Sequence, residues 1–108
     1  MYDVIAAGSA TEDVFVIVKD TAVVSIETAD RQARYLGLPY GAKIAVDQVQ
    51  IMTGGGATNV SANLARLGLK VACLCKLGRD GPGERIFAEL ESLGVDTSLV
   101  RWTDKHRT

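Results

Sequence analysis

The sequence predicts an α/β protein in which helices cross over between the strands of a buried sheet. Two observations carry this prediction. The stretch from Gly54 to Gly94 reads in order as a loop, a helix, a strand and a second helix, which is the order expected of a parallel sheet with crossover helices. Short runs rich in valine and isoleucine fill the first half of the chain and favour strands there.

The first half of the chain is expected to be mainly strand. Asp3 to Gly8 is a short apolar run that predicts a buried strand feeding a loop. The runs Asp13 to Asp20 and Thr21 to Glu27 predict two further strands, joined by a hairpin around Lys19 to Thr21. The mixed stretch "TADRQARYLGLPYG" is expected to be a loop with room for one helical turn. Ala42 to Met52 then predicts two short strands or one bent strand.

The hydrophobic pattern changes to a helical period after the glycine triplet. Apolar residues at Val60, Leu64 and Leu67 predict a helix from Ala57 to Leu67 with its apolar face along them. Gly68 stands where a C-terminal cap belongs. The following "KVACLCKLG" predicts a strand of the buried, parallel kind.

The stretch "RDGPGERIFAELESLG" predicts a second helix. Asp80 is expected near its N-cap, Pro82 suits its first turn, and Gly94 ends it. Its apolar face is expected to consist of Ile86, Phe87, Leu90 and Leu93. A last strand is predicted to begin near Leu99. So few strands would leave the helices half covered, so we expect the natural chain to continue beyond the C-terminus.

Composition excludes several classes of protein. The chain has 108 residues with a formal net charge of -1, so no electrostatic feature favours nucleic acid or an anionic membrane as partner. No apolar run reaches the roughly 18 residues that span a bilayer, and no signal peptide is evident. Cys73 and Cys75 would share one face of a strand, which disfavours a disulfide between them, and His106 is the only histidine. We therefore expect buried free thiols, a cytoplasmic location and no metal site.

The glycine triplet Gly54, Gly55 and Gly56 is the strongest candidate for a binding site. It precedes a helix, whose N-terminus offers free amides and the positive end of the helix dipole, so an anion or a hydroxyl-rich molecule could lie on the backbone. A tight turn from strand to helix explains the same glycines equally well. A dinucleotide fingerprint fits poorly because Asn59 stands where its third glycine belongs, and no Gly-Lys-Ser/Thr follows as in a phosphate-binding P-loop.

Two polar residues could complete such a site. Asn59 falls in the first helical turn, where its amide could meet a ligand on the loop; a local backbone bond is the alternative. Asp13 follows Gly8 at the start of a strand, where a carboxylate could accept hydrogen bonds from sugar hydroxyls. Taken alone, Asp13 is better read as a solvated turn residue than as a ligand.

Together these segments resemble the ribokinase-like (PfkB-type) carbohydrate kinase family. The family signature asks for a glycine pair, an asparagine, small residues and further glycines at set distances. The positions that match it are Gly54, Gly55, Ala57, Asn59, Ser61, Gly68 and Gly78, with Gly56 as a permitted insertion. The opening "GSATED" resembles the first strand and loop of the family, and "GRDGPGERI" and "LESLGVDTSLV" resemble the segments that follow.

The resemblance implies a three-layer α/β sandwich with a small β-sheet lid, of which residues 1–108 would form the N-terminal part. The lid would draw on strands within about 14–52 and on the strand from about residue 99, and such lids often pair between subunits. It also implies transfer of the γ-phosphate of ATP, with Mg²⁺, to a hydroxyl of a sugar or nucleoside. By the same resemblance Asp13, Gly54, Gly55 and Asn59 would hold the substrate hydroxyls, with Thr11 a weaker candidate, and would converge at the carboxyl ends of the strands.

The chain departs from the family in its length and in one motif. Family members are much longer, and a Gly-Ala-Gly-Asp run that supplies their catalytic base and anion hole is absent here. No catalytic residue, ATP site or Mg²⁺ site is therefore evident, and this chain alone is expected to be inactive. The alternatives are a non-catalytic module that binds a sugar or pairs through its lid strands, and a dinucleotide-binding fragment, which the mismatch at Asn59 disfavours.

Overall fold

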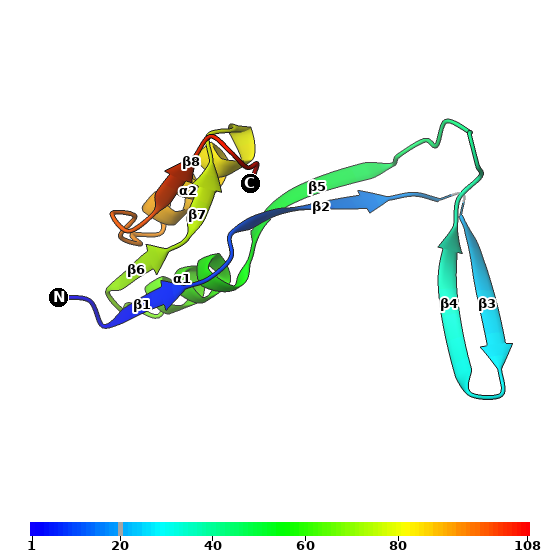
Figure 1. Cartoon of the computed structure of the whole chain (residues 1–108), viewed down its shortest axis with the longest axis horizontal. Helices are drawn as coiled ribbons and strands as arrows, with labels where there is room; N and C mark the ends of the chain where they lie inside the picture. The colour runs from blue at the N-terminus through cyan, green and yellow to red at the C-terminus, as the bar shows by residue number, and fades with distance from the viewer. Residues whose placement is uncertain (20) are drawn as a thin grey trace. The chain divides into compact units, whose positions relative to one another are not determined.

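The computed structural model of the chain describes residues 1–19 and 21–108. It divides into two compact units, one made of Met1–Asp13 and Ile51–Thr108 and the other of Val14–Gln50. Figure 1 labels the elements of both units. Neither of the helices in the described ranges is long and apolar enough to cross a membrane.

The first unit combines helices with parallel strands. Its complete elements in chain order are β1 (Val4–Ala7), α1 (Gly56–Arg66), β6 (Val71–Leu74), β7 (Lys76–Gly78), α2 (Gly81–Ser92) and β8 (Arg101–Thr103). β1 pairs in parallel with β6, and β7 pairs in parallel with β8 (Figure 1). This order confirms the predicted alternation of loop, helix, strand and helix after Gly54. The strand predicted near Leu99 is β8, which belongs to the first unit and pairs there with β7.

The core of the first unit lies along the predicted buried strand. The buried apolar side chains of its main cluster are Ala57, Cys73, Cys75, Leu77, Ile86, Leu90, Val95 and Val100. The stretch "KVACLCKLG" is divided at Cys75 into β6 and β7, and both strands are parallel as predicted. Cys73 and Cys75 are free and buried, and the neighbouring Cys73 thiol together with burial raises the pKa of Cys75. These thiols are packing residues of the core.

The apolar face predicted for α1 is wrong. Val60 and Leu67 are 46 % and 77 % exposed, whereas Ala57, Thr58 and Ser61 are buried. The helix packs through its small side chains, which let its backbone approach the strands closely. Its predicted end is confirmed, because Gly68 has a φ of 87° and its amide donates to the carbonyl of Ala65 at 2.9 Å.

The sequence predicted α2 closely. The Asp80 carboxylate caps it by accepting from the amide of Gly83 at 2.8 Å. The same carboxylate accepts from the amide of Thr108 at 2.9 Å, and these bonds, with that of Thr108 first, lower the pKa of Asp80. Ile86 and Leu90 of the predicted apolar face are each 1 % exposed. The N-terminal cap and the buried face fix this helix firmly in the unit.

The second unit contains an antiparallel hairpin. β3 (Ala22–Thr28) pairs with β4 (Arg31–Gly37), with Thr28 opposite Arg31 at the turn, and both strands are drawn in cyan shades in Figure 1. The prediction of a loop over Arg31–Gly37 is therefore wrong: the Thr28 hydroxyl donates to the carbonyl of Arg31 at 3.2 Å, and the tight turn between them lets the mixed segment return along β3.

The remaining strands are β2 (Thr11–Ile17) and β5 (Gln48–Gly54), which pair with each other in a two-stranded sheet. The predicted hairpin turn around Lys19 to Thr21 includes Asp20, which lies outside the described residues. The strand before this turn, β2, pairs with β5, and the strand after it, β3, pairs with β4. Ala42 to Met52 yields one strand, and only from Gln48 onward.

Candidate functional site

The glycine loop between β5 and α1 is closely packed against another part of the chain. Gly55 has a φ of 104°, and a Cβ placed on it would lie 2.5 Å from the carbonyl oxygen of Ser9 and 2.8 Å from Cα of Ala10. A side chain would therefore be strained and would collide with backbone. At Gly56 the nearest atom to such a Cβ, Oγ of Ser9, is 3.9 Å away. Gly55, in contrast to Gly56, is a glycine that the packing requires.

Asp13 lies directly against Gly54. A Cβ on Gly54 would fall on the Asp13 carboxylate, with Cγ at 2.7 Å and Oδ1 at 2.9 Å. The hydroxyl of Thr11 donates to Oδ1 of Asp13 at 3.4 Å, and the Asp13 side chain remains exposed. The structure thus brings together three of the residues selected from the sequence, and it keeps the carboxylate open to solvent.

The first backbone amides of α1 are hydrogen-bonded to another segment of the chain. The Ser9 hydroxyl accepts from the amide of Gly56 at 3.0 Å, and the Ser9 carbonyl accepts from the amide of Ala57 at 3.0 Å. The hydroxyl of Thr58 donates back to the carbonyl of Gly54 at 2.5 Å. These bonds disfavour a bare anion seated on the helix N-terminus. They also make Ser9 part of the loop, a role that sequence reasoning missed although Ser9 follows Gly8 in the quoted "GSATED".

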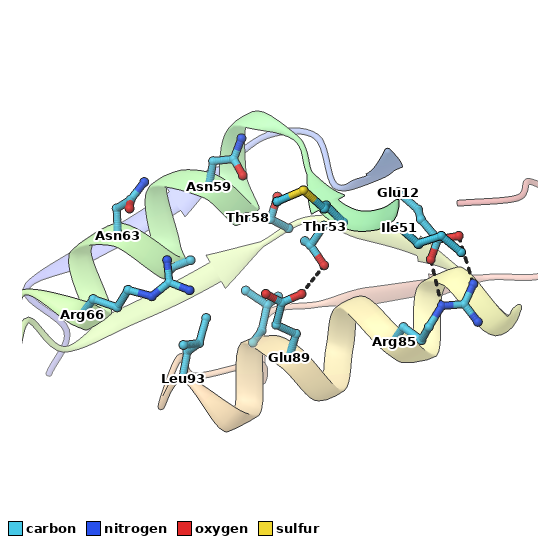
Figure 2. Close-up of a pocket in the computed structure, with 13 residues that line it drawn as sticks. Glu12, Ile51, Thr53, Thr58, Asn59, Asn63, Arg66, Arg85, Glu89 and Leu93 are labelled. Carbon is cyan, nitrogen blue, oxygen red and sulfur yellow. Dashed lines mark hydrogen bonds and ion pairs between the residues drawn. The ribbon is translucent and has the colours of Figure 1, made fainter. Parts of the chain in front are cut away.

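Asn59 lies in the first turn of α1, and its backbone N–H donates to the carbonyl of Gly55 at 3.0 Å. Its side chain is exposed, and no hydrogen bond of that side chain to residues 1–19 or 21–108 is found. Asn59 lines a cavity of about 370 Å³ between α1, α2 and the adjoining ends of β2 and β5 (Figure 2). Glu12 also lines this cavity, whereas Asp13 is not among its described lining residues. The five sequence-selected residues therefore cluster on one loop region, with Asn59 beside the cavity and Asp13 against Gly54.

Two polar contacts cross this cavity from α2 (Figure 2). The Arg85 guanidinium donates to both carboxylate oxygens of Glu12, through Nε at 2.8 Å and Nη2 at 2.9 Å. The hydroxyl of Thr53 donates to Oε2 of Glu89. The pKa of Arg85 is raised above its ordinary value, chiefly by its hydrogen bonds to Glu12. The sequence analysis did not select any of these residues. The spacing of Arg85 and Glu89, which places both charged side chains on one face of α2, could have indicated them.

The chain is similar to known kinases over most of its length. The family model described as "pfkB family carbohydrate kinase" matches residues 18–108. The 2-dehydro-3-deoxygluconokinase of Bacillus subtilis (strain 168) is 31 % identical over 85 residues, which cover 78 % of this chain and 26 % of that enzyme. The match thus spans only about a quarter of the length of this relative.

Solved structures agree on the fold. The crystal structure of a PfkB protein from Polaromonas sp. JS666 is 28 % identical, with a TM-score of 0.64, and the match covers 100 % of this chain and 29 % of that one. A fructokinase with bound ATP from Xylella fastidiosa has a TM-score of 0.68 at 22 % identity, covering 100 % of this chain and 28 % of that one. These likenesses confirm the predicted α/β fold class with its ribokinase-like arrangement.

Proposed function

Because the chain belongs to the pfkB family of carbohydrate kinases, we propose that it is the part of a sugar or nucleoside kinase that binds the substrate accepting the phosphate. The observation that carries this proposal is the exposed Asp13 carboxylate lying against Gly54, which has no side chain. An ionised carboxylate accepts hydrogen bonds and fits the hydroxyls of a sugar. The missing side chain at Gly54, which is buried, lets that carboxylate lie directly over the backbone of the glycine loop.

Each of the selected residues has a role in this proposal. Asp13 accepts from substrate hydroxyls, and Thr11 steadies its carboxylate through their hydrogen bond. Gly54 makes room for the Asp13 carboxylate, and the half-buried Gly55 presents backbone to the ligand, while its close contact with Ser9 and Ala10 fixes the loop. Asn59 supplies an amide that both donates and accepts. The sugar or nucleoside is the partner of this site; Val14–Gln50 is the proposed lid.

The phosphate donor is proposed to be ATP with Mg²⁺, but we assign neither to residues of this chain. The first amides of α1 bond to Ser9, and the amide of Gly83 in α2 bonds to Asp80. The described side chains include no group of three or more acidic, cysteine or histidine residues suited to a metal. A cytoplasmic location agrees with the free, buried thiols of Cys73 and Cys75.

Ligand binding by a matched pair of variants tests this proposal. Asn59 and Asn63 both lie on α1 and line the same cavity (Figure 2), but only Asn59 belongs to the proposed site. Calorimetric titration of the chain with D-ribose, D-fructose, 2-dehydro-3-deoxygluconate and adenosine should show binding of at least one of them. Asn59→Ala and Asp13→Asn are expected to weaken that binding on the order of 10-fold each, and Asn63→Ala is expected to leave it unchanged.

The competing reading is a module without a sugar site that pairs through exposed strands. It is favoured by the exposed Val24 and Ile26 of β3, 47 % and 50 % exposed. If none of the four compounds binds, or if Asn59→Ala and Asn63→Ala act alike, the proposed acceptor site is wrong and this reading takes its place.

A further inference from the structure

Arg85 and Glu89 of α2 form hydrogen bonds with the two residues that immediately precede Asp13 and Gly54 in the sequence. Glu12 immediately precedes Asp13, and it is bonded by Arg85 at 2.8 Å and 2.9 Å. Thr53 immediately precedes Gly54, and it is bonded by Glu89. Because successive residues of a strand point to opposite faces, Glu12 and Thr53 reach α2 from the face opposite to Asp13 and Gly54.

We propose that Arg85 and Glu89 are positioning residues that hold the ends of β2 and β5 so that Asp13 stays against Gly54. This inference rests on the proposed function of Asp13 and Gly54. Arg85 and Glu89 lie four residues apart and therefore on one face of the helix. One helix thus fixes both strands, each at the residue next to the site.

The strands require such support. β2 pairs with β5 in a two-stranded sheet, and a pair of strands is at best marginally stable by itself in water. A carboxylate and a backbone segment that must both contact one ligand lose affinity when they shift relative to each other. Contacts from a third element at each strand end limit that shift.

The helix is rigid enough for this role. Asp80 caps its N-terminus, and the adjoining face of the helix buries Ile86 and Leu90. The contact with Glu12 is also stronger than an ordinary surface ion pair. Its geometry is bidentate, and the Glu12 side chain is only 12 % exposed. Arg85, at 57 %, remains open to solvent on one side.

Variants with matched controls separate positioning from general stability. Arg85→Gln removes the bidentate contact; Arg79→Gln makes the same change of charge at a surface ion pair, Arg79 to Asp104 at 3.4 Å. Thr53→Val removes one hydroxyl at nearly constant shape, and Thr53→Ser restores it. Thr97→Val removes a hydroxyl that donates to Glu91 at 3.4 Å, near the other end of α2.

Three measurements on the whole chain are needed: affinity for D-ribose, D-fructose, 2-dehydro-3-deoxygluconate and adenosine, the melting temperature, and amide hydrogen exchange at Asp13 and Gly54. Arg85→Gln and Thr53→Val are expected to weaken binding on the order of 10-fold and to speed exchange at both amides. Thr53→Ser and both controls are expected to match the original chain in binding and exchange. A merely structural role would lower the melting temperature without changing the affinity of the folded protein.

The exchange measurement keeps this test separate from that of the proposed function. If none of the four compounds binds the original chain, the acceptor site is wrong, and exchange at Asp13 and Gly54 still decides whether α2 holds the strands. If Arg85→Gln does not fold, the comparison of Thr53→Val with Thr53→Ser decides. Binding and exchange in Thr53→Val equal to those in Thr53→Ser would overturn the positioning role.

Discussion

At the scale of single residues, three adjacent glycines have three different environments. Gly54 contacts the carboxylate of Asp13, Gly55 contacts the backbone of Ser9 and Ala10, and Gly56 begins α1 with room for a side chain. The sequence predicts that the triplet allows a close approach. It does not predict which glycine is needed, because the contacting residues come from a segment more than forty positions earlier.

Substituting alanine at two of these positions tests the difference. Gly55→Ala is expected to destabilise the chain by about 2 to 4 kcal/mol, because alanine resists a φ of 104° and its methyl group would collide with the backbone of Ser9. Gly56→Ala is expected to be neutral or to stabilise by up to about 1 kcal/mol, because alanine suits a helix better. Urea unfolding followed by circular dichroism measures both. Equal stability of the two variants would contradict this account of the loop.

The site residues show the same limit of prediction. Asp13 and Asn59 could be selected because their types and spacing match a family signature, and the structure does place Asp13 beside Gly54. Ser9, Glu12 and Arg85 were not selected, because each acts through a partner distant in sequence. A pattern along the chain carries local information, whereas these roles depend on which segments meet.

At the scale of elements, prediction succeeded where capping and burial agree and failed where packing decides. α2 has a capping aspartate, an early proline, a terminal glycine and large apolar side chains on one face, so each local signal gives the same result. In α1 the large side chains Val60 and Leu67 are exposed, and small ones are buried. β4 was missed because its residues have no strong strand preference and depend on pairing with β3.

The β3–β4 hairpin predicts self-association. On one face Val24 and Ile26 lie opposite Tyr35 and Ala33. Val24, Ile26 and Tyr35 are about half exposed. We expect the chain to form dimers through this face as its concentration rises. Ile26→Lys is expected to weaken the dimer by about 10-fold or more, because a buried isoleucine contributes roughly 1.5 to 3 kcal/mol.

Ser25→Lys is the matched control for this prediction, because Ser25 is the neighbouring residue on the opposite face of the same strand. It adds the same charge and should leave association nearly unchanged. Sedimentation velocity over a range of concentrations measures both variants. A monomer at the highest concentration, with the hairpin folded, would argue against the hairpin face as an interface.

At the scale of the whole molecule, the chain matches 26 % of the Bacillus subtilis kinase and 29 % of the Polaromonas structure. Phosphoryl transfer needs a positioned acceptor, stabilisation of charge on the γ-phosphate and bound metal. The residues discussed above offer a site for the first of these. Neither the Gly-Ala-Gly-Asp run of the family nor a phosphate-binding Gly-Lys-Ser/Thr occurs in the sequence.

We therefore expect that the chain of residues 1–108 by itself phosphorylates no sugar or nucleoside. General-base assistance is typically worth about 10²- to 10⁴-fold in rate, and an oxyanion-type donor about 10²- to 10³-fold. Because the run that supplies both in the family does not occur in this sequence, we expect no turnover above the uncatalysed background. The measurement is ATP consumption by the purified chain with D-ribose, D-fructose, 2-dehydro-3-deoxygluconate and adenosine, with Asn59→Ala as control for a contaminating kinase. Turnover that depends on the added compound and disappears in Asn59→Ala would belong to this chain, and it would mean that these residues include a phosphate site.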